Sequence, residues 1–258
     1  MIIRETAIEA VVSVNAAFRE MLSDHKVFTR DDSAECRWQD GDKVRFGKDT
    51  VLEPYTGFFR GNALCSMGAF SYSHSPLYFG LTIGRYCSIA GGLITVAARH
   101  PLEALSSSSF FYDRTMSAAT NAATDLGYDV SRERIPNAHK SAPFIGNDVW
   151  IGTDCAINPG VTVEDGSVIA RRSTVTRTFP AYSLVGGNPA KQIRSRFEDR
   201  ISDRLRQTRW WRLSLGQLNA APKANPAQFL DWYGAEGQHL PDYEPRSLHI
   251  WDEVRRLG

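Results

Sequence analysis

The sequence has no excess of charge of either sign. Its 258 residues carry 30 Lys and Arg against 29 Asp and Glu, which gives a formal net charge of +1. A near-neutral chain produces no overall field that would recruit nucleic acid or an anionic membrane surface, so we expect neither partner. The hydrophobic share of 42% and the charged share of 23% are those of an ordinary soluble globular protein with one or two domains.

Cysteine is scarce, and no two cysteines have CxxC spacing. The four are Cys36, Cys65, Cys87 and Cys155. Isolated, small apolar thiols of this kind suit a reducing compartment, so we expect a cytoplasmic protein. The opening MIIRETAIEAVV contains three charged residues and no cleavage motif. It therefore predicts neither a signal peptide nor a membrane span.

Glycine-rich phosphate loops are also missing, since neither a Walker-type loop nor a dinucleotide fingerprint occurs. What is present instead is a period of six between residues 145 and 180. An aliphatic side chain opens every block: Ile145, Ile151, Ile157, Val163, Ile169 and Val175. Small or medium residues recur four positions later: Val149, Cys155, Val161, Ser167 and Ser173.

A period of six fits neither a helix nor a simple strand. It is typical of a solenoid whose six-residue blocks each form one short face, with three faces to a coil. The opening aliphatics then stack inside, about 4.8 Å apart from coil to coil. One coil cannot bury its own inner face, so neighbouring coils must stack.

The run NDVWIGTDCAINPGVTVEDGSVIARRSTVTRTFPAYSLVGGNPAKQIRSRF resembles the hexapeptide-repeat acyltransferases, which are left-handed parallel β-helices. It is most similar to the branch that contains the streptogramin and type B chloramphenicol acetyltransferases. The resemblance extends upstream through LTIGRYCSIAGG and RHP, and downstream into the RF…RWW region. It implies an all-β solenoid, acetyl-CoA as cosubstrate, and a homotrimer whose active sites lie between subunits.

The chain divides into three predicted regions. Residues 1–40 form an N-terminal helical extension, with a helix over 6–24 that Thr6 caps and Glu9 supports as its capping-box partner. Residues 41–195 form the β-helix acetyltransferase domain. Residues 196–258 form a C-terminal helical region that begins with a helix over 197–206. GGNPA ends the solenoid, because proline cannot continue a strand ladder.

The period disappears between residues 99 and 143, so we expect a long inserted loop over 100–142. Structureless inserts of this length in compact domains are usually functional. His100 stands where the regular coil ends, followed by LSSSSFFYD. Histidine suits proton abstraction near neutral pH, and the resemblance places the catalytic histidine here. We predict His100 as the general base, oriented by Glu103 or by a backbone carbonyl.

Three further residues are predicted at the acceptor site. His139 lies at the return of the insert and is the rival base, while His74 and Trp150 are candidates to line the pocket. The resemblance implies acetyl-CoA contacts at Thr153, Arg171, Thr176, Arg177, Lys191 and Arg194. The family often has small residues where this chain has Arg171 and Arg172. Lys and Arg are the side chains that bind phosphates.

These features predict an acetyl-CoA-dependent O-acetyltransferase acting on a sugar or polysaccharide hydroxyl, without a metal. An antibiotic-modifying O-acetyltransferase of the same architecture is the alternative. A zinc carbonic anhydrase on this kind of solenoid needs three histidines from adjacent coils. Its usual pair, four residues apart, is missing, since Ala104 and Leu105 follow His100 instead. A non-catalytic scaffold is the remaining reading, and the RHP and GNPAK segments argue against it.

Overall fold

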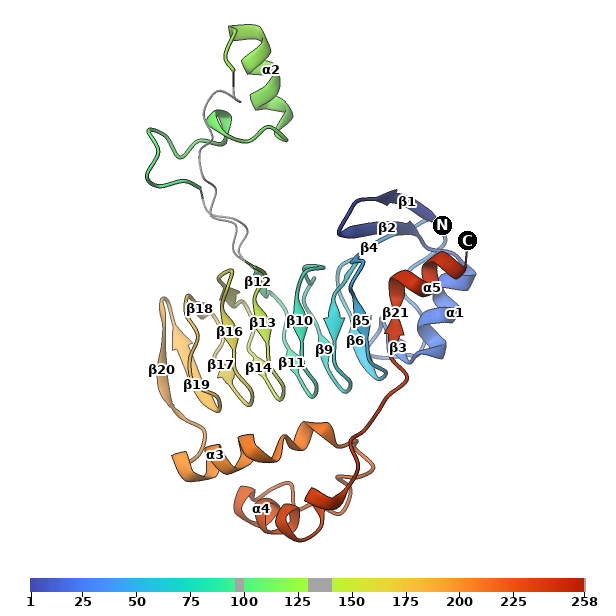
Figure 1. The fold of residues 1–258 in the computed structure, drawn as a ribbon, viewed down its shortest axis with the longest axis vertical. Coiled ribbons are helices and arrows are strands. Elements are labelled where there is room, and N and C mark those ends of the chain that lie inside the picture. The colour runs from blue at the N-terminus through green and yellow to red at the C-terminus, as the bar shows by residue number, and fades with distance from the viewer. Residues whose placement is uncertain (96–99, 130–140, 258) are drawn as a thin grey trace. The chain divides into compact units, whose positions relative to one another are not determined.

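The computed structural model describes residues 1–95, 100–129 and 141–257 (Figure 1). The chain separates into two compact units. Met1–Thr95 and Ala142–Gly258 together form one, which we call the solenoid unit. Val96–Ser141 forms the other, the insert unit. Each is described by itself.

The solenoid unit is a stack of coils whose short strands pair in parallel with the strands of the coils above and below (Figure 1). The largest sheet has the order β20-β19-β17-β14-β11-β9-β6-β3, and a second has the order β16-β13-β10-β8-β5-β21. The third face is built from β12-β15-β18 and, nearer the N-terminus, from β4 and β7. Residues one coil apart are in register, as Ile151 is with Ile169. The predicted parallel solenoid is therefore confirmed.

The strands of this coil are mostly two residues long. They are β3 (Val27–Phe28), β4 (Lys43–Gly47), β5 (Val51–Leu52), β6 (Thr56–Phe58), β7 (Ala63–Leu64), β8 (Ser66–Met67), β9 (Tyr72–Ser73), β10 (Thr82–Ile83), β11 (Ser88–Ile89), β12 (Ile94–Thr95), β13 (Phe144–Ile145), β14 (Trp150–Ile151), β15 (Ala156–Ile157), β16 (Thr162–Val163), β17 (Val168–Ile169), β18 (Thr174–Val175) and β19 (Ser183–Gly187).

The period of six marks the inside of the coil. All six opening aliphatics are buried, with exposed fractions from 0% at Ile145 to 3% at Val163. The small residues four positions later, from Val149 to Ser173, are buried as well. Because successive side chains in a strand point to opposite faces, the residue before each aliphatic points outward, and Trp150 is accordingly 57% exposed.

The N-terminal extension corrects the predicted helix over 6–24. Strands β1 (Ile2–Glu5) and β2 (Glu9–Ser13) form an antiparallel hairpin, and only α1 (Ala16–Asp24) is helical, with Asn15 as its N-cap. Thr6 Oγ1 does accept a hydrogen bond from the Glu9 amide, at 3.2 Å, but in the turn of the hairpin. Strand β2 pairs with β4, so this hairpin covers the first coils.

Glu9 stabilises the hairpin through ion pairs. Its side chain is 8% exposed and bonded to Arg4, 2.9 Å away, and to Arg45 Nε, 2.7 Å away. A carboxylate so nearly buried requires such partners. Arg45 lies on β4, which the chain reaches only after a long segment.

The insert unit was predicted as a structureless loop, and this is wrong for its described part. It contains the 3-10 helix η1 (Ser109–Phe111) and the helix α2 (Ser117–Leu126), which ends at Gly127 in the left-handed conformation. The alanine-rich sequence of α2 has high helix propensity.

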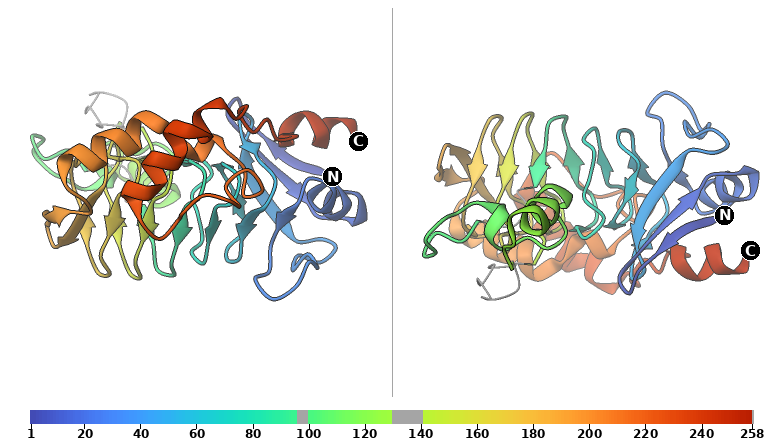
Figure 2. Two further views of the ribbon diagram at one scale, coloured as in Figure 1. Left: turned by 90° about the horizontal axis from the view of Figure 1, so that it is seen from below. Right: turned by 90° about the horizontal axis from the view of Figure 1, so that it is seen from above.

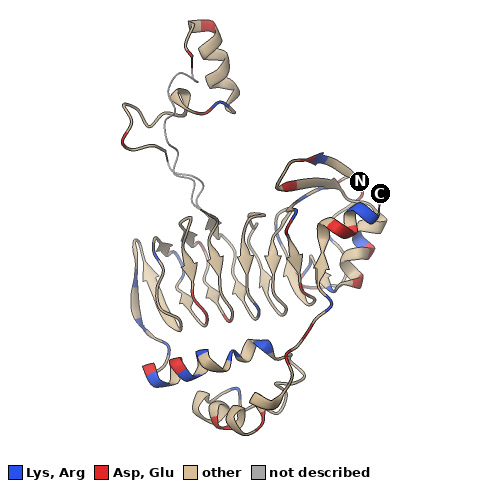
Figure 3. Cartoon of the chain, viewed as in Figure 1, with Lys and Arg blue, Asp and Glu red and all other residues tan. Residues whose placement is uncertain are grey.

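GGNPA ends the coil by reversing the chain. Strand β20 (Ala190–Ser195) runs antiparallel to β19 and is the edge strand of the largest sheet. Helix α3 (Asp199–Thr208), 3-10 helix η2 (Trp210–Arg212), helix α4 (Pro226–Ala235) and 3-10 helix η3 (Gly237–His239) follow. Seen from below, α3 and α4 lie along the stack of coils (Figure 2). On α3 acidic and basic residues alternate (Figure 3).

The C-terminal helices dock on one corner of the coil. This corner column consists of Phe70, Tyr86, Asp148, Gly166 and Tyr182, all with positive φ, between 54° and 68°. The backbone amide of each of the last four donates a hydrogen bond of 2.8–3.1 Å to the preceding coil. The acceptor is the carbonyl oxygen of the residue just before that coil's own column residue, as Ala69 O is for the Tyr86 amide. The Tyr86 hydroxyl donates to Leu213 O at 2.6 Å, and its ring lies 5.0 Å from that of Trp210.

The last segment returns to the start of the solenoid. Strand β21 (Leu248–His249) pairs antiparallel with β5, and helix α5 (Ile250–Arg256) follows it. Leu248, Ile250 and Val254 have no exposed surface and belong to the main core. Both chain ends therefore lie at the same end of the solenoid unit (Figure 1).

Candidate active site

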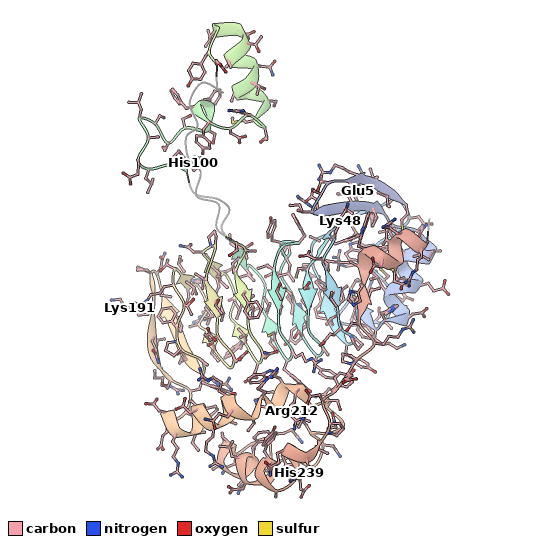
Figure 4. All side chains as sticks on the ribbon, viewed as in Figure 1. Glu5, Lys48, His100, Lys191, Arg212 and His239 are labelled. Carbon is pink, nitrogen blue, oxygen red and sulfur yellow. The ribbon has the colours of Figure 1, made fainter. Side chains whose placement is uncertain are left out.

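His100 lies in the insert unit (Figure 4). Two groups contact one nitrogen of its ring. Its Nδ1 is 2.8 Å from the carbonyl oxygen of Ser107 and 2.8 Å from the hydroxyl of Tyr112. The Tyr112 hydroxyl is in turn 3.3 Å from Ser109 Oγ. Of the two candidates for orienting His100, the backbone carbonyl makes the contact, and Glu103 is exposed, with no hydrogen bond to His100 among the described residues.

These contacts select one tautomer of the imidazole. A carbonyl oxygen only accepts hydrogen bonds, so the bond to Ser107 places the proton on Nδ1. Nδ1–H can be shared with the Tyr112 oxygen, while the Tyr112 hydroxyl donates to Ser109 Oγ. Nε2 is then left unprotonated in the neutral ring, and that nitrogen is the atom able to accept a proton from a substrate hydroxyl.

Local structure around His100 explains the arrangement. The Ser108 side chain accepts a hydrogen bond from the Phe110 amide, at 3.4 Å, and so caps the short helix η1. This turn brings the Tyr112 ring to an edge-on distance of 6.2 Å from the His100 ring. Tyr112 was not among the predicted site residues, because residue spacing alone does not reveal the turn.

His74 and Trp150 both belong to the solenoid unit. His74 lies in an aromatic cluster, 4.9 Å from the Phe59 ring and 5.6 Å from the Tyr72 ring, and its Nδ1 is 3.7 Å from Asp31 Oδ2. Trp150 and Tyr72 point outward from the largest sheet, on strands β14 and β9. Ser88, on the strand between them, pairs with both residues. His139 lies outside the described residues.

The six predicted cofactor residues are all exposed side chains of the solenoid unit. They fall into three places. Thr153 and Arg171 lie on consecutive coils at one corner, where the Arg172 amide donates to Thr153 O at 2.8 Å. Thr176 and Arg177 follow β18, and the Arg177 guanidinium stands 5.0 Å over the Phe179 ring.

Lys191 and Arg194 lie on β20, at the opposite end of the solenoid unit from Glu5 and Lys48 (Figure 4). The Lys191 ammonium makes no ion pair with a described residue. Arg194 Nη1 donates to Ser195 O at 2.9 Å and to Arg196 O at 3.3 Å, which leaves the hydrogens on Nε and Nη2 available. Both side chains can therefore bind an anionic group without first breaking an ion pair.

No group of three His, Cys, Asp or Glu side chains in the described part of the chain is arranged to hold a metal ion. None of the helices in that part has the length and apolarity that crossing a bilayer requires.

Comparison with known proteins identifies the family to which the chain is similar. Residues 142–177 match the model of the bacterial transferase hexapeptide family, six repeats. A chloramphenicol acetyltransferase of Klebsiella aerogenes is 34% identical over 173 residues, which cover 65% of this chain and 76% of the relative. A probable macrolide acetyltransferase of Lysinibacillus sphaericus is 36% identical over 141 residues, 52% of this chain and 70% of the relative.

A solved structure of a hexapeptide-repeat acetyltransferase from Vibrio cholerae is 26% identical to this chain, with a TM-score of 0.36, and covers 52% of this chain and 64% of that one. The repeat model coincides with the most regular coils of the solenoid unit, and the Klebsiella relative extends the match well beyond them. The chain therefore belongs to the hexapeptide-repeat acyltransferases, the family that includes its chloramphenicol acetyltransferase relatives.

Proposed function

We propose that the protein is an acetyl-CoA-dependent O-acetyltransferase in which His100 is the general base. The observation that carries the proposal is the bond between His100 Nδ1 and Ser107 O, which leaves Nε2 free to accept a proton. His100 is exposed, so an acceptor hydroxyl can reach that nitrogen. Membership of an acyltransferase family supplies the reaction class.

The proposed transfer is direct. Nε2 takes the proton of the acceptor hydroxyl while that oxygen attacks the thioester carbonyl of acetyl-CoA, so a C–O bond forms and the C–S bond breaks. The CoA sulfur leaves as a thiolate and receives the proton from the imidazolium. The Ser107 carbonyl stabilises the positive ring between these steps, because Nδ1–H points at a partial negative charge.

Burial makes three of the four cysteines poor competing nucleophiles. Burial raises the pKa of the Cys65, Cys87 and Cys155 thiols, and at Cys87 the value is about 12. Such thiols stay protonated near neutral pH and react slowly. This supports transfer through a ternary complex over an acyl-enzyme.

The exposed cations of the solenoid unit support binding of acetyl-CoA. In this proposal Lys191 and Arg194 bind its phosphates, and Arg171 and Arg177 add charge where the solenoid surface faces the cofactor. Thr153 and Thr176 provide hydroxyls for the amide-bearing pantetheine arm. The left-handed sense of the coil, the homotrimer with active sites between subunits, and the cytoplasmic location belong to the same proposal.

Two acceptor classes remain. The names of the relatives, a chloramphenicol and a macrolide acetyltransferase, favour a hydroxyl of an antibiotic-type small molecule. The prediction from the sequence, a sugar or polysaccharide hydroxyl with His74 and Trp150 as contacts, is the second candidate. It is supported by the aromatic cluster of Phe59, Tyr72 and His74, in which Tyr72 is exposed and the other two rings are half-buried, because flat rings suit a sugar face.

One screen tests both. Purified protein is incubated with acetyl-CoA and chloramphenicol, a macrolide, an oligosaccharide or a sugar nucleotide, and the released CoA thiol is measured. With the acceptor found, His100→Ala should lower turnover by roughly 10²- to 10⁴-fold and leave CoA affinity unchanged in calorimetry.

Tyr112→Phe is the matched control. It removes one contact to Nδ1 but keeps the Ser107 carbonyl, so turnover should fall by less than about tenfold, the worth of one neutral hydrogen bond. A folded His100→Ala variant that acetylates the acceptor at nearly the wild-type rate would refute the proposal, and His139 would then be tested next.

A further inference from the structure

A cavity of about 440 Å³ lies in the solenoid unit between the corner column and the C-terminal helices. Its walls are mainly apolar: Phe197, Leu205, Trp210, Leu218 and Phe229. We call it the C-terminal cavity. Neither His74 nor Trp150 nor any of the six predicted cofactor residues lines it. It is therefore separate from the part of the proposed acetyl-transfer site that the solenoid unit carries.

One side of the cavity carries an ion pair. Arg196 Nη1 donates to Asp148 Oδ2 at 3.0 Å and to Gly166 O at 2.5 Å. The Arg196 guanidinium also stands 5.6 Å from the Tyr182 ring and 5.2 Å from the Phe197 ring. The paired charges cancel, so this side attracts neither anions nor cations strongly. Burial nevertheless raises the pKa of the Asp148 carboxyl, despite the opposing effect of Arg196, which indicates poor hydration here.

Tyr182 supplies a hydrogen-bond donor that is not used. The residue is 1% exposed, and its hydroxyl is shielded from solvent without an acceptor among the described residues. A buried hydroxyl without an acceptor costs free energy. A ligand oxygen that displaced the side chains covering this hydroxyl would accept its hydrogen bond and remove that cost.

The rim of the cavity offers no free charge. Lys223 Nζ donates to three carbonyl oxygens, those of Leu218, Asn219 and Ala221, at 3.0–3.1 Å. Its charge is therefore already solvated by the chain and does not favour an anionic ligand. Leu215, 59% exposed, adds apolar surface at the same rim.

We propose that the C-terminal cavity binds a small, uncharged aromatic molecule that carries a hydrogen-bond-accepting oxygen. The aromatic walls of Phe197, Trp210 and Phe229 bind its ring, and the oxygen accepts from Tyr182. The volume lies within the range of small-molecule sites, about 300–1,000 Å³, and a few polar groups in a mostly apolar pocket are typical of them. The proposal does not depend on the acetyl-transfer reaction.

The test uses two uncharged fluorescent probes on the full chain. Prodan, a naphthalene with a ketone oxygen, should bind saturably at one molecule per chain with a blue-shifted emission. N-phenyl-1-naphthylamine has a similar ring system without the carbonyl and should bind in the same place. Tyr182→Phe should weaken Prodan binding by about 2- to 10-fold, the worth of one neutral hydrogen bond, and leave the second probe unaffected.

A substitution at the rim tests the location. Asn219 is exposed and lines the cavity, so Asn219→Trp adds bulk there without removing a buried side chain. It should reduce the affinity for both probes at least about tenfold, because the added indole occupies space that the ring of the probe needs. Arg204→Trp, an exposed position on α3 that does not line the cavity, is the control and should bind like the wild type.

Three results would overturn the proposal: no saturable binding of either probe to the wild-type protein, equal binding to Asn219→Trp and Arg204→Trp, or an equal effect of Tyr182→Phe on both probes. Melting temperatures of all variants, measured without probe, confirm that each is folded.

Discussion

Asp165 supports Asn147, one coil below it, with a single carboxylate oxygen. Asp165 Oδ1 accepts hydrogen bonds from the Asn147 backbone amide at 2.7 Å and from Asn147 Nδ2 at 2.9 Å. Asn147 Oδ1 repeats the arrangement one coil further down, where it accepts from the Arg85 amide at 2.8 Å. Side chains thus connect three consecutive coils beside the corner column.

Asp165→Ala should destabilise the protein. It removes two hydrogen bonds to a carboxylate and leaves two donors unpaired, and bonds to charged groups contribute about 1.5–3 kcal/mol each. We expect the free energy of unfolding, measured with denaturant, to fall by about 3–6 kcal/mol, the sum for the two bonds. Glu164→Ala is the control, because the Glu164 side chain makes no hydrogen bond in the described structure. An equal loss in both variants would mean that the carboxylate bonds contribute nothing.

Ile157→Asp should prevent folding of the coil. Ile157 is fully buried between the neighbouring coils that Ile94–Thr95 and Thr174–Val175 form. A carboxylate placed there has no partner, at a cost of several kcal/mol. The soluble yield and the cooperativity of thermal melting measure the effect, and Thr162→Asp, on an outward position, should stay folded. A soluble, cooperatively melting Ile157→Asp protein would contradict the inward assignment.

Lys191→Ala and Arg194→Ala test the binding of acetyl-CoA. If each side chain makes one charge-assisted bond to a phosphate, worth about 1.5–3 kcal/mol, each substitution should weaken CoA binding roughly 10- to 150-fold. Calorimetry with CoA measures this, and the apparent constant for the acceptor should change little. Arg200→Ala, on the exposed surface of α3, is the control. Wild-type CoA affinity in the double variant would remove both residues from the site.

Thiol titration tests the burial of the cysteines. The thiolate is the reactive form, and raised pKa values lower its fraction at Cys65, Cys87 and Cys155. At pH 8 a disulfide reagent should therefore react in the folded protein with Cys36 alone, which is half-buried, and with all four thiols after denaturation. Cys36→Ser should abolish the fast reaction. Rapid modification of Cys87 in the folded protein would show that its coil opens.

The regular coils could be predicted from the sequence, because the inward position recurs every six residues and each site selects its side chain locally. The N-terminal hairpin could not. Val11, Val14, Phe18 and Leu22 have a spacing that also suits a helix, and the pairing that decides for a strand comes from Arg45 and its neighbours on β4. Such non-local partners leave no periodic signal in the segment itself.

For the site, the sequence indicated His100 because it ends a regular coil, and it left the orienting group open. The contact with Ser107 depends on the backbone path of the turn before η1, and a carbonyl oxygen is present at every residue, so no side chain reveals it. The docking of the C-terminal helices was equally hidden, since Tyr86 and Asp148 are corner residues whose partners, Leu213 and Arg196, lie far along the chain.

The return of β21 to β5 makes the solenoid mechanically different from an open array of repeats. In an open array each repeat depends only on its neighbours, and the ends fray independently. Here the last strand completes the edge at which the first coils begin, so losing the final residues would expose Leu52 rather than merely shorten a tail. This segment closes the edge of the first coils, so the N-terminal coils reach their full stability only after residues 248–254 have been synthesised and have packed against them.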